Sequence, residues 1–361
     1  MWKTVKLEDV CDIVSGQSPK SNYYNKEMKG TPFYQGSKDF GDRYLNEPTV
    51  WTTKISKKAL PNDILISVRA PVGALNITKQ EICIGRGLSA IREREKVNWD
   101  FLFYSLQISI KNIENKSGAV FDSINRKILQ SLLINLPPLE EQKQIVKKLD
   151  ATFAEIDKNL ENLKKKKKQV ESLVSRVLEE ELKNAKGENV MLGDALIKTK
   201  IKYKVPRKKY LASGEFPIVS QDASTISGFH NNPENIFRVN KPVIVFGDHT
   251  RVLKYIDFDF VIGADGVKIL LPVDEIDSKF LYYFLTLSLP KDKGYARHYK
   301  FLKEIFILVP PLEEQKKIVK KLDAINLEKD ISISALNTEI DNYIALKSSI
   351  LSRELEGKMA V

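Results

Sequence analysis

The sequence has few cysteines and histidines, and this scarcity excludes several classes of protein. Cys11 and Cys83 are the only cysteines in 361 residues, and His230, His249 and His298 are the only histidines. Two cysteines cannot build a disulfide framework, and these scattered residues lack the spacing of a zinc site. The sequence therefore predicts neither a disulfide scaffold nor a bound metal.

Long apolar runs are also missing. No stretch approaches the ~18 apolar residues of a membrane-spanning helix, and the N-terminus has no signal-peptide pattern. We expect no membrane association and a cytoplasmic protein. With 58 Lys and Arg against 47 Asp and Glu, the formal net charge is +11. This excess of positive charge favours a polyanionic partner, most simply nucleic acid.

Motifs of catalytic chemistry are absent as well. Asp248-His249 has no accompanying nucleophile, and Gly85-Arg86-Gly87 lacks the spacing and the following Lys-Ser/Thr of a phosphate-binding loop. The sequence also has no Asn/Asp-Pro-Pro-Tyr/Phe motif and no glycine-rich cofactor loop. We therefore expect a non-catalytic protein with no cofactor of its own, and a nuclease or a methyltransferase is the least favoured hypothesis.

One 14-residue segment, in contrast, occurs twice with almost the same sequence, and it is called the repeated segment below. Residues 137–150 read PPLEEQKQIVKKLD and residues 310–323 read PPLEEQKKIVKKLD, which differ only at Gln144 and Lys317. The period of 173 residues is far longer than that of a solenoid repeat. The sequence therefore predicts two copies of a domain-plus-helix unit and a pseudo-twofold molecule.

A long helix is predicted after each double proline. Neither proline nor glycine occurs between Pro138 and Gly187 or between Pro311 and Gly357. Prolines suit the first turn of a helix, and the glutamates that follow suit its positive end. Apolar residues then recur at alternating steps of three and four, which is typical of a coiled-coil seam. The seam includes Ile145, Leu149, Ile156, Leu160 and Leu163 in the first copy and Ile318, Leu322, Ile340, Leu346 and Ile350 in the second.

The order of segments along the chain predicts how the helices pair. The first helix leads to the second domain and the second helix leaves it, so the two can form an antiparallel coiled coil. A helix of roughly 48 residues would span about 70 Å and would hold the domains about two turns of DNA apart. The lysine run 164–168 is interpreted as a solvated helix face because glutamates flank it.

The remaining segments show short β-branched and aromatic runs separated by turn residues. We predict an α+β protein in which two mixed α/β domains are joined by the two long helices. The predicted segments are a first domain at 1–136, a central helix at 137–187, a second domain at 188–309 and a C-terminal helix at 310–361.

Polar loops between the predicted strands could read DNA. Arginine pairs well with guanine, glutamine with adenine, and lysine or serine with phosphate. The candidates in the first domain are Gln35, Ser37, Lys38, Arg43, Arg69 and Arg86, and those in the second are Gln221, Asp222, His249, Thr250, Arg251 and Lys254.

Three features carry a resemblance to a known family: the repeated segment PPLEEQ-x-x-IVKKLD, the opening residues 2–10 and the run Asn62-Asp63-Ile64-Leu65-Ile66-Ser67. By these features the chain resembles the specificity subunit of type I restriction–modification systems. The resemblance covers essentially the whole chain. It implies two target-recognition domains that each read one half of a bipartite, asymmetric sequence in double-stranded DNA. It also implies that the paired helices fix the unread spacer.

The resemblance further implies partners that perform the chemistry. Two methylation subunits would dock on the helical region, and restriction subunits would join them. S-adenosylmethionine, ATP and Mg²⁺ would be bound by those partners. The helix starts are the expected docking surface, with candidates Pro138, Leu139, Glu140, Gln142, Pro311, Leu312, Glu313 and Gln315. Two rival hypotheses are a coiled-coil protein-interaction scaffold and the specificity subunit of a related multi-subunit restriction enzyme.

Overall fold

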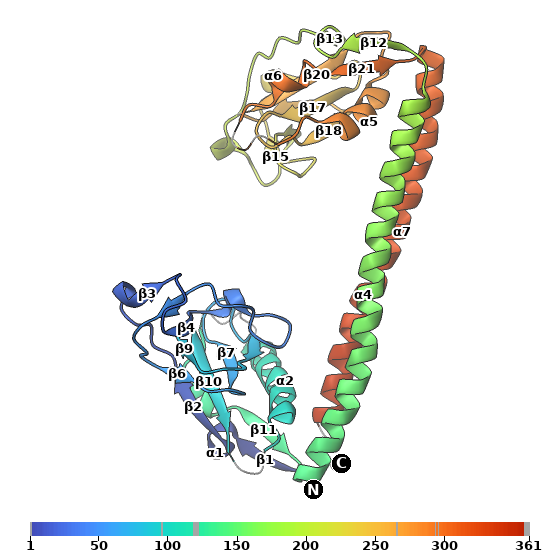
Figure 1. The fold of residues 1–361 in the computed structure, drawn as a ribbon. Coiled ribbons are helices and arrows are strands. Elements are labelled where there is room, and N and C mark those ends of the chain that lie inside the picture. The colour runs from blue at the N-terminus through green and yellow to red at the C-terminus, as the bar shows by residue number, and fades with distance from the viewer. Residues whose placement is uncertain are drawn as a thin grey trace. The chain divides into compact units, whose positions relative to one another are not determined.

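The structure is a computed structural model that describes residues 2–94, 97–117, 123–264, 266–292, 294 and 296–356. By their internal contacts the residues form two compact units. Unit 1 combines Met1–Asn162 with Glu339–Val361, and unit 2 is Leu163–Thr338. Each unit contains one sheet-rich domain and parts of both long helices (Figure 1). The predicted α+β fold with two long helices is confirmed.

The described residues of unit 1 form three sheets. A two-stranded ribbon pairs the strands that enter and leave the domain, a four-stranded antiparallel sheet lies at its centre, and a five-stranded sheet carries one parallel pair, β4 with β9. The ribbon is β1 (Lys3–Lys6) with β11 (Leu133–Leu136). The central sheet is β2 (Cys11–Ser15), β10 (Leu88–Glu93), β7 (Ile64–Ser67) and β8 (Leu75–Ile77), and the third is β3 (Tyr24–Asn25), β5 (Trp51–Thr52), β4 (Thr31–Tyr34), β9 (Ile82–Ile84) and β6 (Lys58–Ala59).

Unit 2 repeats this plan. It has the same type of ribbon, a four-stranded antiparallel sheet, and a third sheet with the parallel pair β14 and β19. The ribbon is β12 (Glu188–Met191) with β21 (Phe306–Val309). The central sheet is β13 (Leu196–Ile197), β20 (Val267–Pro272), β17 (Val243–Gly247) and β18 (Leu253–Ile256), and the third is β15 (Gly228–His230), β14 (Phe216–Val219), β19 (Phe260–Ile262) and β16 (Ile236–Phe237). The duplication read from the sequence is thus present in the topology.

Helices complete each unit. Unit 1 has α1 (Leu7–Val10), α2 (Trp99–Ser117) and α3 (Arg126–Gln130), and unit 2 has α5 (Ser278–Ser288) and α6 (Tyr299–Leu302). The long helices are α4 (Leu139–Asn184) and α7 (Leu312–Leu355), and each begins directly after a double proline as predicted. Short 3₁₀ turns lie at Ser21–Tyr23, Ser37–Asp39, Arg207–Lys209 and Pro233–Asn235.

The long helices run antiparallel in both units. In unit 1, Lys148 Nζ lies 2.8 Å from Glu354 Oε1 and Lys347 Nζ lies 2.7 Å from Asp157 Oδ1. In unit 2, Lys321 pairs with Glu181, and Lys167 Nζ donates to Asn337 Oδ1 over 3.0 Å. In each set the residue number rises along one helix as it falls along the other. The predicted antiparallel pairing is therefore confirmed.

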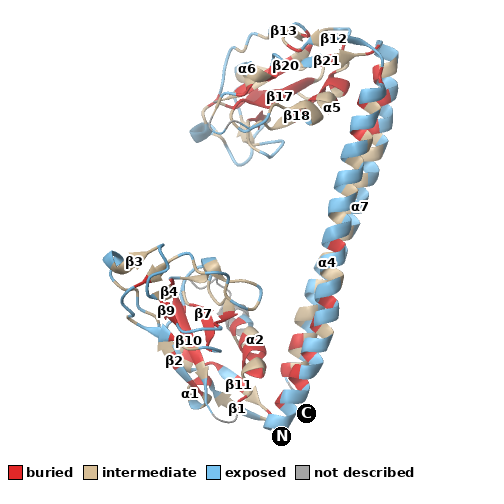
Figure 2. Cartoon of the chain, viewed as in Figure 1, coloured by how far each residue is buried: buried red, intermediate tan, exposed pale blue. Residues whose placement is uncertain are grey.

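The helix pair shares its core with the domains. In unit 1, Leu149 and Phe153 of α4 and Leu351 of α7 join one buried cluster with Phe101 of α2. Figure 2 shows buried residues on the central strands and on the helix faces turned inward. Leu346, predicted in the seam, is 46 % exposed, whereas Leu351 and Leu355 are buried. The last turns of α7 instead place Leu351 and Leu355 in the cluster that contains Phe101 of α2.

The glutamine in each copy of the repeated segment connects the long helix to its own domain by hydrogen bonds. Gln142 is fully buried, accepts a hydrogen bond from the Asn98 N–H over 2.7 Å and donates to the Pro137 carbonyl over 2.8 Å. Gln315, also fully buried, accepts from the Asp277 N–H over 2.8 Å and donates to the Pro310 carbonyl over 2.7 Å. The amide therefore bridges the start of the long helix to the start of α2 or α5.

The aspartate that ends each copy of the repeated segment makes a second contact between helix and domain. The Tyr104 hydroxyl donates to Asp150 over 2.6 Å, and the Tyr283 hydroxyl donates to Asp323 over 2.5 Å. Burial, followed by this hydrogen bond, raises the pKa of each phenol, which therefore stays protonated and donates at neutral pH. The near-identity of the two copies of the repeated segment thus has a structural cause in part, because the same side chains hold each domain on its long helix.

Candidate nucleic-acid interface

In unit 1 the loops after three strands meet at one edge. Because β4 and β9 are parallel, their carboxyl ends lie side by side. Gly85 N donates to the Tyr34 carbonyl over 2.8 Å, and Gly87 N donates to the Gln35 carbonyl over 3.1 Å. The loop after β7 joins them, since Val68 N donates to the Gly87 carbonyl over 2.9 Å.

Three predicted DNA-reading residues lie at this first recognition edge. Gln35 follows β4, Arg69 follows β7 and Arg86 follows β9, and all three are exposed. The glycines beside Arg86 permit the close approach: a Cβ on Gly85 would lie 2.8 Å from the Gln35 Cα, and one on Gly87 would lie 2.6 Å from the Gln35 carbonyl oxygen. An amide and two guanidinium groups therefore share one surface, and these groups suit adenine and guanine edges.

Unit 2 builds the second recognition edge in the same way. The loops after β14, β17 and β19 meet there, and Gln221, His249 and Thr250 are among their polar residues. The Thr250 hydroxyl donates to the Gln221 carbonyl over 2.6 Å, and the His249 N–H lies 3.4 Å from the Gln221 side-chain oxygen. His249 occupies the place of Arg69, because both lie two residues beyond the end of the equivalent strands β17 and β7. The edges are thus alike in backbone and different in side chains.

Arg43 has a structural role instead of the predicted DNA contact. Its guanidinium pairs with Asp100 and lies 3.4 Å from Asp150 Oδ1, and it stacks over Phe103 and Tyr104 with 5.3 and 5.4 Å to the ring centroids. Only 27 % of the side chain is exposed. These contacts join the domain to α2 and α4, so we remove Arg43 from the DNA-reading set.

Lys254 and Asp222 belong to one hydrogen-bond network within unit 2. Lys254 is buried, and its ammonium donates to the Ser220 carbonyl over 2.8 Å and to the Ser224 carbonyl. Burial lowers the pKa of Lys254, while Asp222, 3.4 Å away, opposes that shift. Asp222 accepts hydrogen bonds from Ser220 and Ser227 over 3.0 Å each. This network holds the loop after β14, so both residues support the position of the second edge.

The other candidates flank the edges. Ser37 and Lys38 lie in the 3₁₀ turn just after Gln35, where Lys38 is exposed. Arg251 follows Thr250 with a φ of 60°, is half-buried and lies 3.4 Å from Asp292. None of these contacts prevents a role at the surface, and the three residues stay predictions.

The helix-start candidates fall into two groups. Gln142 and Gln315 are buried between helix and domain, so they are unavailable to a partner and leave the docking set. The exposed group is Pro138, Leu139, Glu140, Pro311, Leu312 and Glu313.

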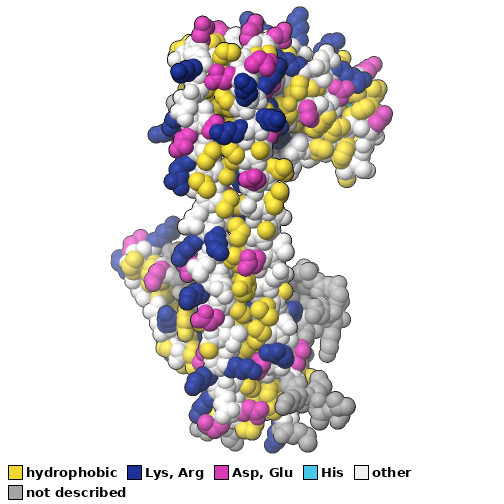
Figure 3. Space-filling model, turned by 90° about the vertical axis from the view of Figure 1, so that its right-hand side faces the viewer, with side chains coloured by type: hydrophobic (Ala, Val, Ile, Leu, Met, Phe, Trp, Pro, Cys, Tyr) yellow, Lys and Arg dark blue, Asp and Glu magenta, His cyan; other side chains and the backbone are white. Residues whose placement is uncertain are grey.

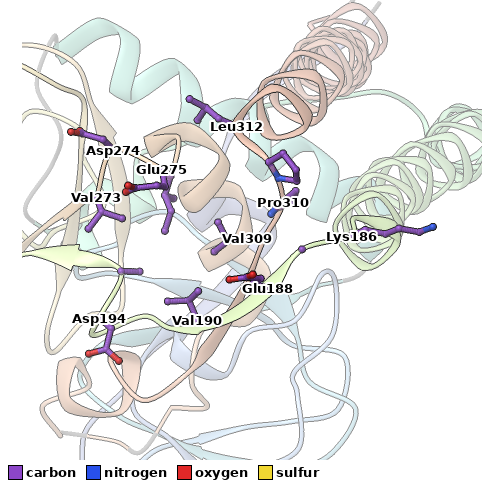
Figure 4. Close-up of a pocket in the computed structure, with 14 residues that line it drawn as sticks. Lys186, Glu188, Val190, Asp194, Val273, Asp274, Glu275, Val309, Pro310 and Leu312 are labelled. Carbon is purple, nitrogen blue, oxygen red and sulfur yellow. The ribbon is translucent and has the colours of Figure 1, made fainter.

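A cavity of about 960 Å³ lies beside the start of α7 in unit 2 (Figure 4). Val190, Val309 and Leu312 give it apolar walls, and Glu188 and Asp194 lie among its lining residues. Gly187, which also lines it, corresponds to Trp2 of unit 1, where the indole packs against the core and donates to Glu141 over 3.0 Å. A glycine in place of a tryptophan leaves this part of unit 2 less filled.

Two classes of site do not occur in the part of the chain that the structure describes. No group of three or more His, Cys, Asp or Glu side chains could hold a metal ion there. Within the same residues, no helix combines the length and apolar character that crossing a membrane requires.

Family comparison gives the same twofold division. The family model described as the type I restriction modification DNA specificity domain matches residues 1–172 and, a second time, residues 186–342. The chain belongs to this family. Each specificity domain of the chain takes in one recognition edge and the beginning of one long helix.

Individual relatives carry the same kind of name. The chain is 46 % identical over 181 residues to the protein named for the MjaX type I restriction enzyme specificity subunit of Methanocaldococcus jannaschii, which covers 49 % of this chain and 41 % of that protein. It is 25 % identical to the MjaVIII specificity subunit of the same organism, over 100 % of this chain and 93 % of the relative. The EcoBI specificity subunit of Escherichia coli is 21 % identical, over 99 % and 86 %.

A solved structure shares the fold. A chain from work on the complex assembly and conformational transition of the type I R-M system matches with a TM-score of 0.74 and 22 % identity. The match covers 98 % of this chain and 97 % of the solved one. The α+β architecture is therefore shared with this solved chain over nearly the whole length.

Proposed function

We propose that this chain is the DNA-recognition subunit of a type I restriction–modification complex. In this proposal unit 1 reads one half of a bipartite, asymmetric target and unit 2 reads the other half. The observation that carries the proposal is the paired recognition edge: the same strand ends meet in both units, but Gln35, Arg69 and Arg86 stand in one, and Gln221 and His249 in the other. Equal backbones with different side chains suit the reading of two different sequences.

The chain is proposed to be non-catalytic. Methyl transfer and DNA cleavage would come from partner subunits, with S-adenosylmethionine, ATP and Mg²⁺ bound there, and the chain itself would need no cofactor. The sequence supports this assignment because it contains no methyltransferase, nuclease or P-loop motif. Acting on DNA in this way, the protein would reside in the cytoplasm.

Exposed apolar residues on the helices support the docking of two methylation subunits and of restriction subunits. Along the face drawn in Figure 3, hydrophobic side chains are interspersed with charged ones on the long helices. Exposed large hydrophobic residues on α4 and α7 suit the apolar centre of a protein interface. In unit 1 they are Leu139, Ile344 and Leu346, and in unit 2 Leu173, Leu312, Leu327 and Ile331.

Substitution at one edge tests the proposal. Arg69→Gln combined with Arg86→Gln should weaken recognition of one half-target, by about 1–3 kcal/mol for each base contact that is lost. The assay is sequence-dependent binding and methylation of duplex DNA by the chain assembled with its methylation subunits. His249→Ala is the matched variant at the other edge and should affect the other half-target. Unchanged recognition in both variants, or sequence-specific methylation by the chain alone, would contradict the proposal.

A further inference from the structure

One short segment of unit 2 is strongly basic. Residues 198–209 read KTKIKYKVPRKK and contain seven Lys and Arg and no Asp or Glu. Residues 188–309 as a whole have 18 basic and 14 acidic residues, so outside this basic segment the domain is acidic, with 11 against 14. The positive charge of the second domain is thus concentrated in 12 residues.

The charges of the basic segment face solvent. All seven basic side chains belong to exposed residues. Lys200, Lys202, Lys208 and Lys209 form no ion pair with any residue that the structure describes. The segment runs without helix or ladder pairing from the end of β13 to the 3₁₀ turn Arg207–Lys209 (Figure 1). An unneutralised row of cations on extended backbone is a favourable surface for a polyanion.

The basic segment is anchored beside the second recognition edge. Val205 N donates to the Ile262 carbonyl over 2.9 Å and Ala264 N donates to the Val205 carbonyl over 2.7 Å, at the end of β19. Lys204 Nζ lies 3.2 Å from the Val267 carbonyl. On the neighbouring turn, a Cβ on Gly266 would lie 2.5 Å from the Gln221 side-chain oxygen. The middle of the basic segment therefore lies next to the turn after β19, which in turn lies against Gln221 and His249.

The matching segment of unit 1 lacks this charge. There the chain between β2 and the end of the 3₁₀ turn Ser21–Tyr23 is residues 16–23, which are shorter and contain one basic residue, Lys20. Gln17 takes the place of Val205, since its N–H donates to the Ile84 carbonyl over 2.9 Å. The basic segment is therefore an addition to one copy of a duplicated fold and is not required by the fold itself.

We propose that the basic segment binds the phosphate backbone of DNA beside the half-target read by unit 2. This inference rests on the proposed function and deepens it. Phosphate contacts supply affinity without sequence information, because every phosphate is alike. Unit 2 thus holds the duplex electrostatically as well as reading it.

Charge removal tests this assignment on the full chain. The basic-segment variant combines Lys200→Gln, Lys202→Gln, Lys208→Gln and Lys209→Gln. The control variant combines Lys158→Gln, Lys164→Gln, Lys166→Gln and Lys168→Gln, which removes the same charge from exposed positions of α4. Binding to a fluorescent duplex of unrelated sequence is measured from about 50 to about 200 mM salt, a range in which phosphate contacts dominate.

The slope of log affinity against log salt is the readout. Each lost phosphate contact lowers its magnitude by about 0.9, so the basic-segment variant should lose about 3.6 and the control variant much less. The methylated sequence should remain the same in both variants. An unchanged slope in the basic-segment variant, an equal loss in the control, or an altered methylated sequence would overturn the inference. If the unsubstituted chain binds no DNA, alone or assembled with its partners, the proposed function itself fails.

Discussion

Replacing Gln142 by leucine should destabilise unit 1 strongly. Leucine has a similar size, so the substitution mainly removes hydrogen bonds and leaves little cavity. The Asn98 N–H and the Pro137 carbonyl would lose their partner, at 2.7 and 2.8 Å in the intact protein. An unpaired buried polar group costs about 1–3 kcal/mol, so the two together predict a loss of about 2–6 kcal/mol. Gln315→Leu should act similarly on unit 2.

Urea unfolding, followed together with hydrogen exchange, measures this effect. The transition of unit 1 should move to lower urea, and the Asn98 amide should exchange faster because its acceptor is gone. Glu140→Gln is the control in the same turn of α4, since Glu140 is exposed and pairs only locally with Lys143 at 2.7 Å. Such a pair contributes at most ~0.5 kcal/mol. A loss below about 1 kcal/mol in Gln142→Leu, or unchanged exchange of the Asn98 amide, would refute the docking role of the glutamine.

Three further predictions follow from the contacts described above. Arg43→Gln should lower the free energy of unfolding by about 2–3 kcal/mol and leave the methylated sequence intact. Arg69→Gln should leave the free energy of unfolding intact and alter the methylated sequence, and a shared phenotype would contradict the two roles. Lys254→Met should lower the melting temperature and weaken recognition of one half-target, because the Ser220 carbonyl loses its donor; an unaltered half-target would argue against the positioning role. The raised pKa of Tyr104 means that its contribution to stability is complete below pH ~10, the ordinary pKa, and is lost as pH rises through the higher pKa of the folded state. Alkaline unfolding of unit 1 should therefore depend less on pH in Tyr104→Phe, and an identical pH profile would exclude this cause.

Sequence periodicity predicts the long helices, and the order of segments along the chain predicts their antiparallel pairing. Helix starts and seams are local patterns, and Leu149 and Leu322 are fully buried as expected. Leu346 is exposed instead, and Leu351 and Leu355 join the domain core, a contact that no helical period contains. The spacing between the two domains stays a prediction.

The site residues were harder to predict because their partners are distant in sequence. Arg43 finds Asp100 and Asp150 at separations of 57 and 107 residues, so a loop arginine could not be distinguished from a docking arginine. Lys254 is neutralised by a loop 30 and more residues away. The basic segment 198–209, in contrast, is plain in the sequence, and its charge alone could have drawn attention to it.

The buried glutamines show what a repeated sequence segment can and cannot reveal about the role of its residues. Identity of Gln142 and Gln315 in two copies indicates a shared constraint, but the sequence alone allows either a partner surface or an internal contact. Burial decides between them, because a fully buried amide with hydrogen bonds to two segments serves the fold. The exposed Leu139 and Leu312 of the same repeated segments remain the better candidates for contact with a partner subunit.

Exchange of one module, read out on DNA, is the most direct experiment. Residues 188–309 are replaced by the matching residues of another family member, and methylated adenines are mapped in cells that also make the methylation subunits. Division of labour between the two recognition edges predicts that one half of the methylated sequence changes while the other half and the spacer remain. A change in both halves, or in neither, would contradict it.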